Sequence, residues 1–199
     1  MSCLTDRSRC VAYQECPRKR YYAYEYNGTG VVSSAVRPEL LVGSAVHVGL
    51  EHLLRGASME DALQHALVEW AKAGEQPLRP EFRVHQSLME MLLRAFNSVG
   101  KEQLLAEYDI ISLEEEINAP LGSGVTFMSR PDGVLRSKTD GRLYALSFKT
   151  AAQLSVQSVL DSAVSMQCLS EMWAIQQKYG EHPVGVQYVY LIKGRKSDG

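Results

Sequence analysis

Hydrophobic residues recur at helical spacing through the first half of the chain, and this pattern predicts that nearly all of that half is helix. In the segment that follows Pro38, Leu41, Ala45, Val48 and Leu53 share one face, as is typical of an amphipathic helix. The predicted helical segments cover residues 6–15, 17–26, 38–55, 58–73 and 84–108. The segment at 17–26 is either a turn or a helix.

Capping and breaking residues set the predicted ends of these segments. A polar side chain before a helix accepts hydrogen bonds from its first backbone N–H groups, proline fits the first turn, and glycine favours the last. The start signals are Thr5 or Asp6, Pro17, and Ser58 with Asp61 as a capping box, and the stop signals are Gly56 and Gly74 with Pro77.

The second half of the chain changes to short β-like segments, at 109–121, 125–135 and 142–150. The last two are predicted to form a hairpin whose polar turn ends in Asp140-Gly141. A helix is then expected over about 155–179, with Gly180 as its stop, followed by an alternating strand, "VGVQYVYLIK". The predicted order is therefore αβββαβ after the leading helices.

Length and composition favour one α/β domain over residues 1–199, with a mainly helical portion at 1–106 and the hairpin core, helix and final strand at 107–199. The formal net charge of −2 gives no overall attraction to nucleic acid, so any DNA contact must come from local basic clusters and metal ions. The chain has no apolar run long enough for a membrane span, and "MSCLTDRSRC" lacks the apolar centre of a signal peptide. We expect a cytoplasmic protein with no membrane partner.

Five stretches in this order resemble the PD-(D/E)XK nuclease superfamily, and within it the branch of the RecB nuclease domain, the AddAB nucleases and Cas4. They are "CVAYQECPRKRYYAYEY", "VGSAVHVGLEHL", "RPDGVL", "SFKT" and "MQCLSEMWAI". The resemblance runs from about residue 11 to residue 192. It implies a restriction-endonuclease-like αβββαβ core, a mixed sheet flanked by helices, with an N-terminal helical elaboration.

The resemblance also implies a site for Mg²⁺ or Mn²⁺. Asp132 and His47 would bind the metal, Lys149 would be the catalytic ammonium, and Gln167 would reach the site from the following helix. Magnesium prefers about six oxygen ligands and keeps several waters, so such a site needs only a few carboxylates. A lysine two residues after an acid on a strand points to the same side of the sheet.

Ser147 stands where the family has its second motif carboxylate, and this is the main departure from the pattern. A neutral hydroxyl is a poor magnesium ligand, so the substitution should weaken metal binding. Either another acid has moved in, with Glu114 and Glu116 on one strand face and Glu115 on the other as candidates, or catalysis has been lost, or the serine is a change introduced to trap an inactive enzyme.

Each candidate residue also has a plain structural interpretation. His47 could be a hydrogen-bonded helix histidine, with Glu51 one turn on either orienting it or merely solvated. Asp132 before a glycine could be a turn residue, and Lys149 could face solvent. Gln167 could be an ordinary polar position, because the aromatic that the family usually has one turn later is Glu171 here.

The segment "RKRYYAYEY" interleaves basic and aromatic residues, a composition suited to phosphate contacts and base stacking on single strands. We take Arg18, Lys19, Arg20 and Tyr22 as candidate DNA-binding residues, although tyrosines at helical spacing are as often part of a core.

Four cysteines, Cys3, Cys10, Cys16 and Cys168, lack zinc-like spacing and are expected to be reduced thiols. Cys16 matches the first of four cysteines that hold an iron-sulfur cluster in several members of the branch. Because no cysteine follows Cys168, we expect no iron-sulfur cluster in this chain.

These observations together predict a metal-dependent DNA nuclease that hydrolyses phosphodiester bonds, with exonuclease action on DNA ends favoured by family analogy. The expected partners are DNA ends or single strands and a recombination, repair or CRISPR-type protein. The alternative is a catalytically inactive nuclease-fold module that binds DNA or a protein partner. An unrelated α+β metabolic domain is a third interpretation, and it requires Asp132, His47 and Lys149 to lie apart.

Overall fold

The structure is a computed structural model that describes residues 3–31, 37–72 and 80–193. The helices are α1 (Arg7–Glu15), α2 (Pro17–Tyr24), α3 (Pro38–Leu54), α4 (Met59–Ala71), α5 (Pro80–Ala95), α6 (Lys101–Glu107), α7 (Val156–Ala163) and α8 (Met166–Tyr179). The strands are β1 (Cys3–Asp6), β2 (Tyr108–Leu113), β3 (Ile117–Gly122), β4 (Val125–Ser129), β5 (Gly133–Ser137), β6 (Leu143–Ala151) and β7 (Val186–Ile192). None of the helices within these three ranges is long and apolar enough to cross a membrane.

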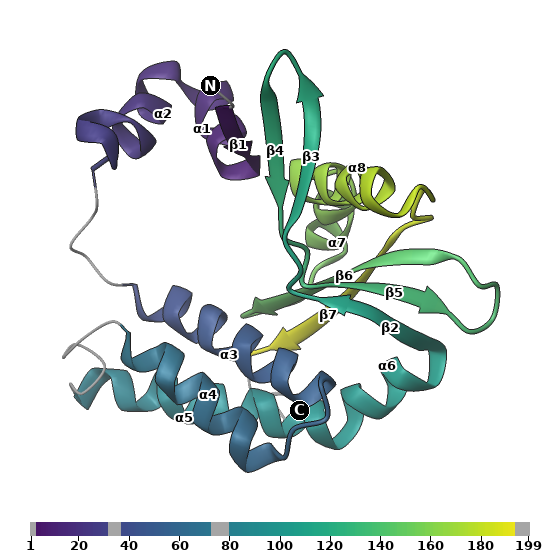
Figure 1. Ribbon diagram of the computed structural model, residues 1–199. Helices are drawn as coiled ribbons and strands as arrows, with labels where there is room; N and C mark the ends of the chain where they lie inside the picture. The colour runs from purple at the N-terminus through teal and green to yellow at the C-terminus, as the bar shows by residue number, and fades with distance from the viewer. Residues whose placement is uncertain (1–2, 32–36, 73–79, 194–199) are drawn as a thin grey trace.

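The strands form two sheets (Figure 1). A four-stranded mixed sheet has the order β2-β5-β6-β7, in which β2, β5 and β6 are antiparallel and β7 runs parallel to β6. A three-stranded sheet has the order β1-β4-β3, with β1 parallel to β4. The path α6-β2-β5-β6-α8-β7 has the αβββαβ order expected from the sequence, and the β3–β4 hairpin is inserted between β2 and β5.

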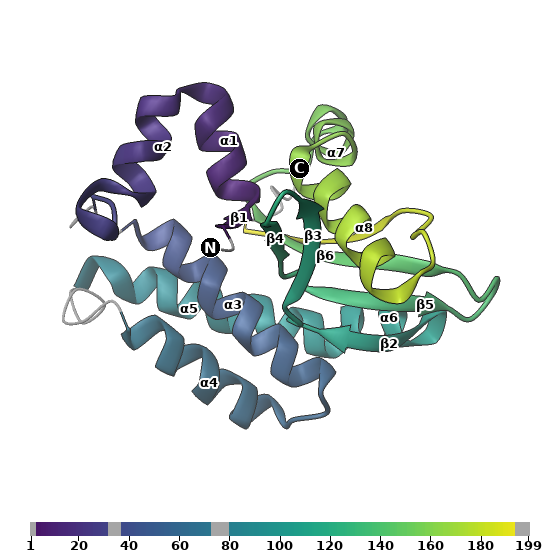
Figure 2. The same ribbon diagram turned by 45° about the horizontal axis from the view of Figure 1, so that its top comes forward.

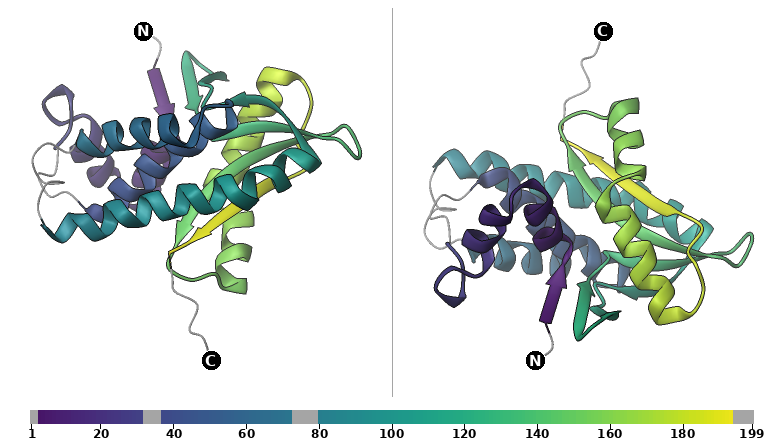
Figure 3. Two further views of the ribbon diagram at one scale, coloured as in Figure 1. Left: turned by 90° about the horizontal axis from the view of Figure 1, so that it is seen from below. Right: turned by 90° about the horizontal axis from the view of Figure 1, so that it is seen from above.

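Helices cover both faces of the four-stranded sheet (Figure 3). On one face, α3, α4 and α5 form the larger hydrophobic core with the strands, in which Leu50, Leu93 and Leu146 have no exposed surface. On the other face, α8 packs Ala174 and Ile175 against Ala145 and its neighbours. Burial of this apolar area is the main force that fixes the helices on the sheet.

Strand β6 is central to the site because its side chains alternate between these two cores. Leu146 and Phe148 belong to the core under α3, and Ala145 belongs to the core under α8. Since alternate residues of a strand point to opposite faces, Ser147 and Lys149 lie on the α8 face. This confirms the prediction that Ser147 and Lys149 share a face while Phe148 turns into the core.

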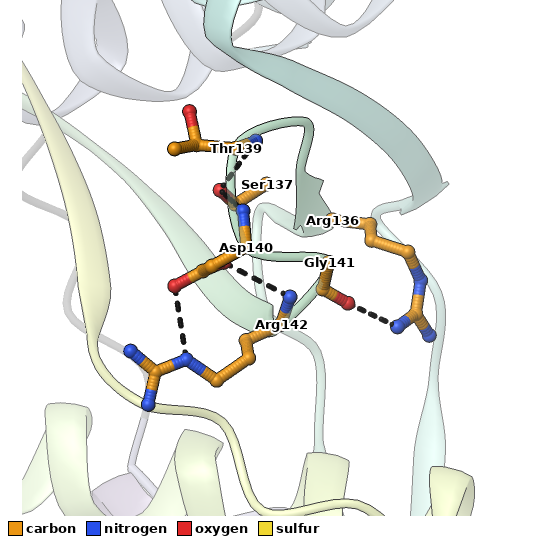
Figure 4. A network of polar contacts seen from close by, with 6 residues as sticks. All are labelled: Arg136, Ser137, Thr139, Asp140, Gly141 and Arg142. Atoms are coloured by element: carbon orange, nitrogen blue, oxygen red, sulfur yellow. Dashed lines mark hydrogen bonds and ion pairs between the residues drawn. The ribbon is translucent and has the colours of Figure 1, made fainter.

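The predicted hairpin is formed by β5 and β6, and a network of polar contacts stabilises its turn (Figure 4). Ser137 Oγ accepts hydrogen bonds from the backbone N–H groups of Thr139 and Asp140. The carboxylate of Asp140 accepts hydrogen bonds from the backbone N and the Nε of Arg142, and Gly141 adopts a positive φ of 72°. Glycine adopts this conformation without steric cost, which explains why the turn ends in Asp-Gly.

The structure has more breaks than the sequence pattern predicts. The expected strand at 109–121 is two strands, β2 and β3, because Glu114 turns the chain with a φ of 50°. The expected strand at 125–135 is β4 and β5, separated near Pro131. The helix expected over 155–179 is α7 and α8, because Ser165 caps a new helix by accepting a hydrogen bond from the backbone N–H of Cys168.

The predicted capping residues are largely confirmed. Asp6 caps α1, Pro17 opens α2, and Gly180 ends α8 in a left-handed conformation. Ser58 caps α4 through the N–H of Asp61, but the Asp61 carboxylate accepts from the Ser58 hydroxyl and not from its backbone N–H, so only half of the predicted capping box forms. The helical pattern at 84–108 is α5 and α6 joined by a π-helical turn, Phe96–Gly100. The stop signals at Gly74 and Pro77 lie outside the described residues.

Candidate active site

A cleft with a volume of about 1290 Å³ opens where α3, the start of β5, the end of β6 and α8 come together. Helices α3 and α8 lie on opposite sides of β6 (Figure 2). The lining includes His47 from α3, Asp132 from the residues before β5, Lys149 from β6, and Gln167 and Glu171 from α8. The structure therefore brings together four residues that the sequence analysis placed in one site.

Asp132 is the centre of a cluster of metal-ligating groups. One ligand atom each from His47, Glu114 and Asp132 lies within 4.8 Å of the others. His47 Nδ1 is 3.2 Å from Asp132 Oδ1, and the backbone N–H of Phe148 donates to Asp132 Oδ2 at 2.6 Å. One imidazole and two carboxylates fit Mg²⁺ or Mn²⁺, which accept oxygen ligands together with an imidazole.

Backbone geometry on two neighbouring strands places these carboxylates. The N–H of Glu114 donates to the carbonyl oxygen of Asp132 at 3.2 Å, so the end of β2 is tied to the start of β5. Gly133 allows this approach, because a Cβ there would lie 3.0 Å from the carbonyl oxygen of Ser112. The positive φ of Glu114 costs a non-glycine residue about 1–2 kcal/mol, and it turns the side chain away from the strand alternation.

The cluster carries more negative charge than its surroundings compensate. Burial, and next the charge of Asp132, raise the pKa of Glu114 to about 7. Burial lowers the pKa of His47, but the hydrogen bond and the charge of Asp132 outweigh it, and the pKa lies above its ordinary value. A divalent cation would relieve this repulsion, and the donor set therefore fits a metal.

A chain of hydrogen bonds crosses the other side of the cleft. Lys149 Nζ donates to Gln167 Oε1, and Gln167 Nε2 donates to Glu171 Oε1 at 2.9 Å. Burial lowers the pKa of Lys149, although the negative charges of Glu171 and Asp132 oppose the shift. Burial also raises the pKa of Glu171 to about 7. Gln167 thus orients the Lys149 ammonium toward the cleft.

Ser147, between these groups on β6, is only 1% exposed, and its Oγ has no hydrogen-bond partner among the described residues. The residue is therefore not a surface substitution. It lies on the buried α8 face of the sheet, two residues before Lys149 on β6.

Comparison with known families tests the resemblance. The sequence model of the PD-(D/E)XK nuclease superfamily matches residues 7–199. The chain belongs to this superfamily. A comparison with curated proteins finds no significant match. Membership excludes an unrelated metabolic domain, and the meeting of Asp132, His47 and Lys149 in one cleft agrees with it.

Of the three glutamates of this PD-(D/E)XK protein that the sequence analysis gave as candidate substitute carboxylates, the structure places only Glu114 in the metal-ligating cluster. Glu115 forms an ion pair with Lys178 and accepts a hydrogen bond from the hydroxyl of Tyr179. Glu116 lines the cleft and accepts a hydrogen bond from Asn118 Nδ2.

The basic and aromatic segment on α2 is exposed. Among its described residues α2 has no buried side chain and contributes none to the cleft lining. Lys19 pairs with Glu15, and Arg20 pairs with Glu25. The rings of Tyr21, Tyr22 and Tyr26 form one cluster of partly exposed aromatics.

Three further features bear on residues singled out from the sequence. Glu51, for which the sequence left open an orienting role toward His47 or a solvated charge, lines the cleft and pairs with Arg55. Cys10, Cys16 and Cys168, the cysteines whose side chains are described, form no disulfide with one another. Arg7, at the start of α1, lines the cleft and was not identified from the sequence, because a single arginine at a helix start carries no distinguishing signal.

The metal-free protein is expected to lose stability as the pH rises from 5 to 8. The folded-state pKa of Glu114 and of Glu171 is about 7, above the ordinary 4.5, so the folded state binds more protons than the unfolded state between these values. The raised pKa of His47 acts in the same direction, because its favourable interaction is lost on deprotonation. We expect the free energy of unfolding, measured with urea, to fall by about 5 kcal/mol, about half of it from each carboxyl at about 1.4 kcal/mol per pKa unit.

The Glu114→Gln variant provides the control for this pH effect. It removes one of the two titrating carboxyls, so its stability should fall less steeply over the same pH range. Saturating Mn²⁺ should also flatten the curve for the wild-type protein. A stability that rises from pH 5 to pH 8 without metal would contradict the assignment of these charges.

Proposed function

We propose that this PD-(D/E)XK protein is a cytoplasmic, Mg²⁺- or Mn²⁺-dependent deoxyribonuclease of the RecB, AddAB and Cas4-like branch, acting as an exonuclease on DNA ends. The observation that carries the proposal is the meeting of His47, Glu114 and Asp132 within 4.8 Å, in a cleft that also holds Lys149. The reaction is hydrolysis of a phosphodiester bond.

The charge of the cleft supports a requirement for metal. Acidic residues outnumber basic ones in its lining, and the acidic ones are Asp6, Glu39, Glu51, Glu69, Glu114, Glu116, Asp132 and Glu171. The basic ones are Arg7, Lys72, Arg130, Lys149 and Lys193. A phosphate diester would be repelled from the buried carboxylates, so a cation is needed to bring the substrate to this point.

In the proposed reaction each residue has a separate role. A divalent cation, when bound, supplies Lewis acidity toward the phosphate and an acidified water. Asp132 and His47 bind it, with Glu114 as the third ligand, and the N–H of Phe148 fixes the orientation of Asp132. Lys149, oriented by Gln167, places a positive charge beside the phosphate, where negative charge develops during the displacement.

The DNA strand is proposed to continue from the cleft toward α2. Arg18, Lys19 and Arg20 would contact phosphates, and the exposed rings of the tyrosine cluster with Tyr22 would stack on bases. A recombination, repair or CRISPR-type protein is the proposed partner.

The test is incubation of the pure protein with end-labelled linear DNA and Mn²⁺, alongside the Ser147→Asp and Lys149→Ala variants. Cleavage by the wild-type chain that Lys149→Ala abolishes would support an active enzyme. Cleavage only after Ser147→Asp would support the second candidate function, a module that binds DNA or a protein partner without cutting, which the serine at the motif position favours. If none of the three cuts, the enzyme proposal fails.

A further inference from the structure

Helix α8 runs antiparallel to β6 with a matching register. At one end Gln167 contacts Lys149, and at the other Ile175 packs in the same core as Ala145. Four helical residues advance about 6 Å along α8, and two strand residues advance about 6.5 Å along β6. Glu171 is midway between Gln167 and Ile175 on α8, as Ser147 is midway between Lys149 and Ala145 on β6, so this spacing sets Glu171 level with Ser147 along the strand.

The Glu171 side chain is buried on this face, and only one of its two carboxylate oxygens accepts a hydrogen bond from the described residues. The residue is 8% exposed and lines the cleft. Oε1 accepts the hydrogen bond from Gln167, but Oε2 is buried and has no hydrogen-bond partner within the described part of the chain. A buried carboxylate oxygen without a partner is costly, and a bound cation is the kind of partner that offsets this cost.

At the motif position, the strand residue and the carboxylate come from two different elements. Ser147 occupies the position on β6 with a short, uncharged side chain, and Glu171 on α8 carries the carboxylate. The charge of Asp132 acts on Glu171, so the two carboxylates lie within electrostatic reach across the cleft. Lys149, which belongs beside the missing acid, is linked to Glu171 through Gln167.

We propose that Glu171 on α8 is the acidic ligand that β6 lacks at Ser147, and that it binds the divalent cation together with Asp132. The inference rests on the proposed function. It places ligands on both sides of Asp132, with His47 and Glu114 from the α3 side and Glu171 from the α8 side.

The test moves the carboxylate back to the strand. Mn²⁺ affinity is measured by titration calorimetry for the wild-type protein, Glu171→Gln, Ser147→Asp, and the double variant that combines them. Glu171→Gln keeps the oxygen that accepts from Gln167 and removes the charge. It is expected to weaken Mn²⁺ binding about tenfold or more, since even residues outside the first ligand sphere contribute 10–100-fold to metal affinity.

The double variant distinguishes a ligand from a structural residue. If Glu171 supplies the missing charge, adding Asp at position 147 should restore the affinity of Glu171→Gln to within about threefold of the wild type. A residue that only positions Gln167 would not be rescued from another element. Glu90→Gln, on the exposed face of α5 and paired with Arg94, is the matched control and should bind Mn²⁺ as the wild type does.

The outcomes separate this inference from the proposed function. Wild-type Mn²⁺ affinity in Glu171→Gln, combined with loss of affinity in Asp132→Asn, would overturn the role of Glu171 and leave the metal site standing. Loss of affinity in Glu171→Gln without rescue in a double variant that melts as the wild type does would also overturn it. Absence of Mn²⁺ binding by the wild-type protein would overturn both proposals.

Discussion

Replacing Asp132 with Asn is expected to lower the rate of Mn²⁺-dependent DNA cleavage by about 10³-fold, because the removal of a metal-binding charge forfeits several kcal/mol of transition-state stabilisation. Asp132 is the residue shared by every contact in the cluster, with Oδ1 toward His47 and Oδ2 on the N–H of Phe148. Asparagine keeps the shape of the side chain but carries no charge, so the loss should appear in Mn²⁺ affinity as well as in rate.

The measurement is single-turnover cleavage of end-labelled DNA over a range of Mn²⁺ concentrations. Asp109→Asn is the control, because Asp109 is exposed on β2 and pairs with Lys138 outside the cleft. The change removes repulsion from Glu114 but also the charge that pairs with His47, so the melting temperature of the metal-free variant is measured to confirm that it is folded. Cleavage by Asp132→Asn at the wild-type rate would remove Asp132 from the mechanism.

Replacing Lys149 with Met is expected to lower the rate constant for cleavage by about 10²–10³-fold, the usual effect of losing one preorganised charge at a developing anion. Methionine fills the same volume without the ammonium. Because Lys149 is a cation beside Asp132 and Glu171, its removal should leave Mn²⁺ affinity unchanged or higher. The decisive observation is this separation of rate from metal binding.

Lys178→Met is the matched control, because Lys178 lies near the end of α8 and pairs with Glu115 away from the cleft lining. Its rate should equal that of the wild type. If Lys149→Met cut DNA normally, or lost Mn²⁺ binding in proportion to its rate, the role assigned to its ammonium would be wrong.

Local sequence signals predicted where helices begin and end better than they predicted whether a long segment is one element or two. Asp6, Ser58 and Gly180 act through hydrogen bonds or conformations within a few residues, so their roles are readable from short stretches of sequence. The break at Glu114 is different. It depends on a positive φ that is tolerated because the N–H of Glu114 bonds the backbone of Asp132, which is distant in sequence.

The candidate site was predictable only in part for the same reason. His47, Asp132 and Lys149 were identified from motifs, and the structure brings them together. Strand alternation could not select Glu114 among three consecutive glutamates, because alternation ends where the backbone turns. Glu171 stood out in the sequence only as a departure from an aromatic position, since its relation to Ser147 depends on how α8 packs across β6.

The pairing of β6 with β7 also constrains when the cleft is assembled during synthesis. Ser147 pairs with Tyr188, and because the pairing is parallel the chain must cross over between the two strands, here through α7 and α8. Likewise Cys3 of β1 pairs with Val125 of β4, so β1 can pair only after more than half of the chain has been synthesised. Such distant pairings form late. A chain in which β7 has not yet been synthesised leaves one edge of β6 unpaired, so the strand that carries Ser147 and Lys149 gains its second neighbour only when residues 186–192 have been added.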